Sequence, residues 1–213
     1  MNFIVTRPEH DITTKYLSAW AGEIISLAEN KKINVIDLWR DKANRDDLVG
    51  RVKKWDPELI FLNGHGGDDC ISGQDNRILI KAGDNHEILQ KRITYALSCN
   101  SGKILGQKVA EDNTSTYIGY SDEFIFVGDS NYISRPLVDP KAEPFKEASN
   151  QLMISLLKGN SAKDASERSK EKFRENIRKL TSSIADSDSL QIAQCLWWNM
   201  RHQVCLGNIE AKL

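Results

Sequence analysis

Two segments decide the fold and the candidate chemistry of this chain: LIFLNGHGG at residues 59–67 and ITYALSCNSG at residues 93–102. Each opens with an apolar run typical of a buried strand and then breaks at small or polar residues. The first run leads to His65 and the second leads to Cys99. Glycines on both sides of the histidine leave the backbone free to turn sharply. The sequence therefore predicts a histidine and a cysteine at the ends of two strands.

Predicted strands alternate with predicted helices on both sides of these segments. Further strands are predicted at three apolar runs, residues 3–5, 33–38 and 116–120. This alternation indicates one α/β domain over residues 1–213, with a mostly parallel sheet of about six strands flanked by helices. If the two segments are parallel neighbours, His65 and Cys99 emerge at the carboxyl edge of the sheet and face one crevice.

Four other segments have patterns that bear on the site. Residues 70–80 predict a hairpin, and a helix is predicted at residues 103–112, directly after Cys99. Residues 121–144 lose their periodicity and predict a long loop near the carboxyl end of the sheet, and such loops are usually functional. Polar residues 181–189 predict a linker before the last helix and strand.

The pairing of a histidine with a cysteine indicates nucleophilic chemistry. A helix amino terminus beside Cys99 and a nearby imidazolium both favour the thiolate, which is the nucleophilic form. A lone histidine or cysteine is more often a loop or core residue, so the prediction rests on the pair and its flanking glycines. The remaining cysteines and histidines are assigned core, surface or structural roles: Cys70, Cys195, Cys205, His10, His86 and His202.

The segments 61–67 and 96–102, with 34 positions between His65 and Cys99, resemble the catalytic signature of caspase-like cysteine peptidases, in particular the gingipain-like and CHAT branches. The likeness continues through three further segments, 116–120, 156–165 and 203–208, in the last of which relatives usually carry Gly-Asp. The setting of the cysteine departs from the Gln-Ala-Cys-x-Gly motif of the animal caspases. The resemblance covers most of the chain and implies a three-layer caspase-like fold.

The same resemblance implies a cysteine endopeptidase that performs limited proteolysis through a thioester acyl-enzyme. In that role Cys99 attacks the scissile carbonyl, while His65 supports the thiolate and protonates the departing amine. The N–H groups of Gly66 and Cys99 bind the oxyanion. This chemistry needs no metal or organic cofactor, and no third catalytic residue is identified from the sequence.

Three residues are predicted to contact the substrate residue that precedes the cut. Asp122 and Glu123 follow the predicted strand at residues 116–120, near the place where similar enzymes build the first specificity pocket, and a buried carboxylate there pairs with arginine or lysine. Many basic-specific relatives have aspartate two positions before the nucleophile, where this chain has Leu97. An apolar wall at Leu97 favours an uncharged, aliphatic residue, and this preference is predicted ahead of a basic one.

Bulk properties restrict the partners and the compartment. The 213 residues have a formal net charge of -1, which removes any general electrostatic reason to expect nucleic acid or an anionic membrane as a direct partner. Residues 1–7 do not resemble a signal peptide, and no apolar run reaches membrane-spanning length. The four cysteines show no C-x-x-C spacing, which predicts reduced thiols in the cytoplasm and no zinc site.

Two alternatives compete with the peptidase. The first is a catalytically inactive scaffold or peptide-binding module, against which the presence of both His65 and Cys99 argues. The second is a flavodoxin-like signalling domain, which would need a glycine-rich phosphate loop after the first strand. The expected partner is a protein or peptide substrate. Similarity to CHAT-type proteases of bacterial defence systems further implies a separate regulatory or activating protein.

Overall fold

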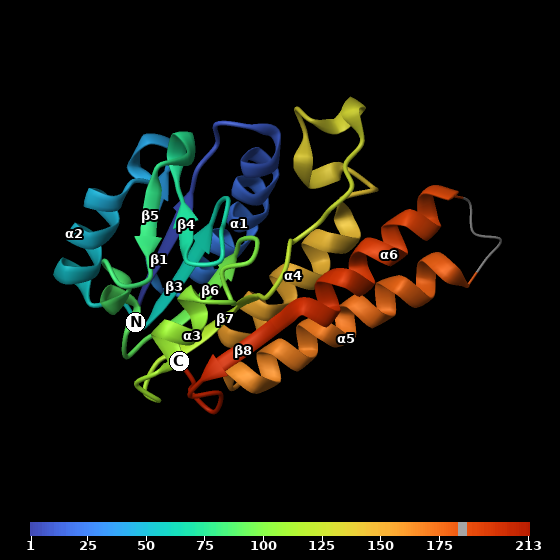
Figure 1. Ribbon diagram of the computed structural model, residues 1–213. Coiled ribbons are helices and arrows are strands. Elements are labelled where there is room, and N and C mark those ends of the chain that lie inside the picture. Colours follow the sequence, from blue (N-terminus) through green and yellow to red (C-terminus); the bar gives the residue numbers. More distant parts are fainter. Residues whose placement is uncertain (183–186) are drawn as a thin grey trace.

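A six-stranded sheet forms the centre of the protein in this computed structural model, which describes residues 1–182 and 187–213 (Figure 1). The strands lie in the order β2-β1-β3-β6-β7-β8. Their bounds are β1 Asn2–Arg7, β2 Asn34–Trp39, β3 Leu59–Asn63, β6 Ile93–Leu97, β7 Thr116–Tyr120 and β8 Gln203–Gly207. Neighbouring strands are parallel except for β8, which runs antiparallel to β7. The predicted mostly parallel sheet of about six strands is confirmed.

In the part of the chain that the structure describes, six α-helices connect or follow these strands: α1 Ile12–Asn30, α2 Arg45–Trp55, α3 Leu105–Ala110, α4 Glu143–Leu156, α5 Ala162–Thr181 and α6 Ser187–His202. Local chemistry sets their ends. The Asp11 carboxylate accepts a 2.7 Å hydrogen bond from the Thr14 N–H and so caps α1. Aspartate is among the residues preferred at this position. α2 ends at Asp56, which adopts a left-handed conformation directly before Pro57.

The four central strands, β1, β3, β6 and β7, bury both of their faces, which gives three layers. Alternate side chains such as Phe3, Phe61 and Tyr95 pack with α1, α4, α5 and α6 on one face. The intervening side chains, such as Ile4 and Leu62, pack with α2, α3 and the hairpin on the other face. Burial on both faces is typical of parallel sheets covered by helices.

Most of the smaller elements match those predicted from the sequence. The predicted hairpin is present as β4 Cys70–Ser72 paired antiparallel with β5 Ile78–Lys81. The helix predicted at residues 103–112 is shorter, because α3 begins only at Leu105. The linker predicted at residues 181–189 lies partly outside the described residues, since α5 ends at Thr181 and α6 begins at Ser187.

The register of β3 and β6 determines where the two chemically active residues leave the sheet. These strands are parallel neighbours, and Asn63 lies opposite Leu97 at their carboxyl ends. His65 and Cys99 therefore emerge from adjacent strands at one edge, as predicted. The loop after β7, drawn in yellow in Figure 1, rises beyond this edge between α1 and α6. Among the described helices, none has the length and apolarity needed to cross a lipid bilayer.

Candidate active site

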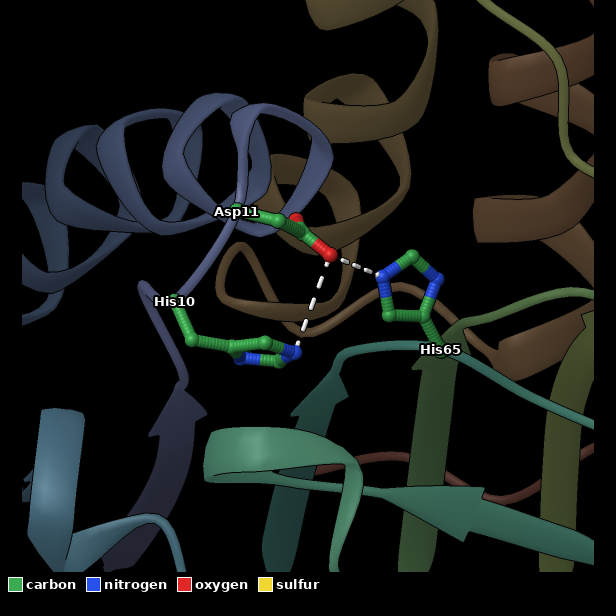
Figure 2. A group of neighbouring side chains, drawn as sticks. All are labelled: His10, Asp11 and His65. Atoms are coloured by element: carbon green, nitrogen blue, oxygen red, sulfur yellow. Dashed lines mark hydrogen bonds and ion pairs between the residues drawn. The ribbon is translucent and has the colours of Figure 1, made fainter.

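His65 is held by a carboxylate that comes from a neighbouring strand connection. Its Nε2 lies 2.5 Å from Oδ2 of Asp11, in the loop between β1 and α1 (Figure 2). Asp11 is fixed at the same time by its role as the cap of α1. Partial burial acts to raise the pKa of Asp11, but hydrogen bonds from Thr14 and His65 outweigh it and hold that pKa below its usual range.

This contact orients the imidazole of His65. With the Nε2 proton donated to Asp11, the lone pair lies on Nδ1, which points away from Asp11 in Figure 2. A carboxylate that binds one ring nitrogen selects the tautomer and stabilises the imidazolium when the other nitrogen takes up a proton. The sequence did not predict the contact between Asp11 and His65, because the two residues lie 54 positions apart.

The surroundings of Cys99 favour its neutral thiol. Burial raises its pKa most, and the carboxylates of Glu123 and Asp122 add to the rise against a smaller opposing effect of the Phe124 backbone. The thiol also donates to the Phe124 carbonyl from 3.8 Å, a contact that favours the protonated form. The predicted helix amino terminus beside the thiol is wrong, since α3 begins only at Leu105. Cys99 therefore needs a base to become nucleophilic.

Gly66 packs directly against the cysteine loop. A Cβ atom at Gly66 would lie 2.2 Å from both the Cys99 carbonyl oxygen and Oγ of Ser98, so only glycine fits. Gly66 also lies opposite Ile71 in an isolated antiparallel bridge. The hydrogen bonds of this bridge come from the flanking residues, since the Gly67 N–H donates to the Cys70 carbonyl. Within residues 1–182 and 187–213, neither the Gly66 N–H nor the Cys99 N–H donates to a carbonyl of another residue.

A pocket of about 460 Å³ opens beside Cys99. Apolar and aromatic side chains from α1 and from the loop after β7 form most of its wall: Ile12, Tyr16, Phe124, Ile125, Phe126 and Ile133. Glu123 and Asp129 add carboxylates. The Asp129 carboxylate is already engaged locally, because its Oδ1 accepts a 2.9 Å hydrogen bond from the Asn131 N–H.

The three residues predicted to contact substrate have different positions. Glu123 lines the pocket. Asp122 does not line it, and its carbonyl accepts a 3.0 Å hydrogen bond from the Asn100 N–H. Leu97 is fully buried in the layer that contains α1 and α4, so it forms no wall of the pocket. The structure therefore contradicts a substrate contact by Leu97.

Two buried polar groups fix the loop that forms the pocket. Asn199 on α6 is fully buried, accepts from the Ile125 N–H at 2.9 Å and donates to the Ile125 carbonyl at 2.6 Å. Asp139, also fully buried, accepts from the Tyr16 hydroxyl at 2.6 Å and from the Asp129 N–H at 2.8 Å. Burial and the bond to Asp139 raise the pKa of Tyr16, which stays neutral. The pocket is thus preformed by α1, α6 and the loop.

His10 completes a second grouping around the candidate histidine. One ligand atom each from His10, Asp11 and His65 lies within 4.8 Å of the others, an arrangement that can hold a metal ion. A surface or structural role was predicted for His10 from the sequence. Its nearness to His65 results from the turn between β1 and α1, which no local pattern reveals.

The fold and the site define an α/β protein in which a carboxylate-bound histidine and a half-buried thiol leave adjacent parallel strands beside an apolar pocket. No protein-family model matches the chain, and no curated protein matches it.

Proposed function

We propose that this protein is a caspase-like cysteine endopeptidase in which Cys99 is the nucleophile and His65 is the general base and acid. One observation supports the proposal most strongly: the loops that bear these residues leave adjacent parallel strands and pack so tightly that Gly66 leaves no room for a side chain against Cys99. The pocket beside Cys99 offers a place for the substrate residue that precedes the cut.

The proposed reaction starts from the neutral thiol. As Sγ of Cys99 attacks the scissile carbonyl carbon, Nδ1 of His65 takes up the thiol proton, and Asp11 stabilises the imidazolium. The N–H groups of Gly66 and Cys99 donate to the oxyanion. The carbon–nitrogen bond then breaks, His65 gives its proton to the departing amine, and a thioester remains. Water attacks the thioester with His65 again as base, which releases the acid product and the thiol.

The substrate class in this proposal is a protein or peptide in the cytoplasm. Net charge near zero and a largely apolar pocket support an extended polypeptide rather than nucleic acid. A separate regulatory or activating protein belongs to the same proposal and rests on the resemblance to CHAT-type proteases.

The test compares wild-type protein with Cys99→Ala, His65→Ala and the double variant on a peptide library. Each single variant should lose activity by at least about 1,000-fold, and the double variant should be no worse, because residues that act as a unit are not additive. Cys70→Ala is the matched control and should retain activity. Circular dichroism should show an unchanged fold throughout.

Full activity in either single variant would remove the dyad. If the protein is instead an inactive peptide-binding module, the same samples should give a different result. The wild type would bind peptides and leave them uncut, and that outcome would replace the peptidase proposal.

A further inference from the structure

The histidine of the proposed dyad also belongs to a cluster with the chemistry of a zinc site. Nε2 of His65 lies 2.5 Å from Oδ2 of Asp11, and Nε2 of His10 lies 3.6 Å from the same oxygen (Figure 2). The two imidazole rings meet edge to face with their centroids 5.9 Å apart. Two imidazoles and one carboxylate form a ligand set that suits Zn²⁺, with water at the fourth, open position.

The spacing requires only a small adjustment to accept the ion. Bond lengths of roughly 2.0–2.1 Å in a tetrahedral site place two ligand atoms about 3.3 Å apart. The 3.6 Å separation between His10 and Asp11 is close to this value. The 2.5 Å contact between His65 and Asp11 must lengthen, because the ion replaces the shared proton. Both of these side chains are 37% exposed, so an ion can reach them from solvent.

His10 makes a single side-chain hydrogen bond among the described residues. Its Nε2 donates to Oδ1 of Asn76 at 3.2 Å, while its Nδ1 is buried and has no hydrogen-bond partner in the described part of the chain. Coordination of the ion by Nε2, which already lies 3.6 Å from Asp11, therefore replaces one hydrogen bond.

We propose that His10, Asp11 and His65 form an inhibitory zinc site, and the inhibitory part rests on the proposed peptidase function. Zn²⁺ bound at Nε2 of His65 moves the remaining ring proton to Nδ1. Nδ1 then donates and no longer accepts, so it cannot take the proton of the Cys99 thiol. The ion also occupies the Asp11 carboxylate that stabilises the imidazolium. The thiol itself takes no part in binding.

Binding is measured first without any activity, by calorimetric titration of Zn²⁺ into Cys99→Ala. One ion should bind per chain, and adding His10→Gln should weaken binding at least about tenfold, because the amide is a poor zinc ligand. Cys99→Ala with His202→Gln removes an imidazole outside the cluster and should bind as Cys99→Ala does. Absence of binding to Cys99→Ala, or equal affinity after His10→Gln, would overturn the zinc site.

Cobalt reports the ligands directly. Co²⁺ bound to Cys99→Ala should show the strong visible bands of tetrahedral coordination without a thiolate charge-transfer band in the near ultraviolet. A charge-transfer band would place the ion on Cys70, Cys195 or Cys205 and would contradict the proposal.

Activity is the second measurement. Zn²⁺ should inhibit wild-type cleavage, a chelator should restore it, and His10→Gln should cleave normally in the same zinc concentration. Equal inhibition of His10→Gln would contradict the proposal. If Cys99→Ala binds Zn²⁺ through His10 but the wild type cleaves no peptide, the metal site stands and the peptidase fails. If cleavage occurs but no zinc binds, the peptidase stands and the zinc site fails.

Discussion

Asp11 serves two elements at once. Its carboxylate accepts from the Thr14 N–H at the start of α1 and from Nε2 of His65 across the sheet edge. The helix therefore fixes the carboxylate, and the carboxylate fixes the imidazole. This sharing explains how an imidazole at the end of a loop keeps a defined orientation.

Asp11→Asn separates the two roles. Asparagine caps helices as well as aspartate does, so the thermal midpoint should change little. The negative charge that stabilises the imidazolium is lost, and kcat should fall at least about tenfold with little change in KM. Asp11→Ala is the comparison and should lose about 1 kcal/mol of stability in addition. An Asp11→Asn variant with wild-type kcat would show that the carboxylate has no part in the reaction.

Cys99 should show the pH profile of a half-buried, protonated thiol rather than that of a preformed thiolate. Because burial raises its pKa, the thiolate fraction at neutral pH is small and grows as the pH rises. The rate of iodoacetamide labelling should therefore keep rising from about pH 7 to beyond about pH 9. Mass spectrometry should still place Cys99 ahead of Cys205, whose pKa burial raises to about 11. A rate that levels off below about pH 7 would instead indicate a resting ion pair.

Apolar runs that break at small or polar residues allowed the sequence to predict that His65 and Cys99 follow adjacent parallel strands. It could not place Asp11 or His10 beside His65, because that contact depends on how the turn after β1 leaves the sheet. Leu97 was misplaced for a simpler reason. It has the same parity as Tyr95 on β6, and that face of the strand is covered by the layer containing α1 and α4.

At the level of elements, the loop after β7 and the start of α1 determine what enters the pocket. Ile12 and Tyr16 come from the helix, and Phe124, Phe126 and Ile133 come from the loop. Ile12 itself is 54% exposed, so the rim of the pocket is apolar as well as its floor. The expected occupant is an uncharged side chain.

Matched fluorogenic peptides that differ only before the cut test this preference. Leucine or methionine should exceed arginine, lysine and aspartate by about tenfold in kcat/KM, since a few buried methylene groups are worth that much. The carboxylates contribute little, because Glu123 is exposed and Asp129 bonds within its own loop. Glu123→Gln should therefore keep the leucine preference. An arginine preference that disappears in Glu123→Gln or Asp129→Asn would reverse this assignment.

The whole molecule should lose stability in alkaline solution. Burial raises the pKa values of Tyr95, Tyr117 and Tyr120, and it raises the pKa of Cys205 to about 11. The unfolded chain releases these protons at ordinary values of about 8.5 for cysteine and 10 for tyrosine, so the folded state holds more protons above those values. Stability from these groups is complete below about pH 8.5 and declines as the pH rises toward the folded-state values.

Urea unfolding at several pH values measures this decline. Cys205 alone should contribute at most about 3 kcal/mol between its unfolded and folded pKa values. Cys205→Ala should show a shallower loss from about pH 8.5 upward than the wild type. A free energy of unfolding that stays constant to about pH 10.5 would contradict the neutral, buried state of these groups.

The sequence also allowed most of the architecture to be predicted, since each parallel strand must be apolar on both faces and therefore appears as a continuous apolar run. Ile93–Leu97 is an example, with every residue buried. The sequence did not predict the length of α3 correctly. Tyr120 accepts from the Gly102 N–H and Asp68 accepts from the Ile104 N–H, so long-range contacts delay the start of that helix.

The antiparallel course of β8 has a consequence for synthesis on the ribosome. Cys99 and the pocket loop are made early, yet the loop is fastened by Asn199 and by Ser121, whose N–H donates to the His202 carbonyl. The emerging chain folds from its amino terminus as it is made. The pocket beside Cys99 therefore cannot assemble until α6 and β8 have left the exit tunnel, so the proposed peptidase would gain its substrate pocket only when synthesis is almost complete.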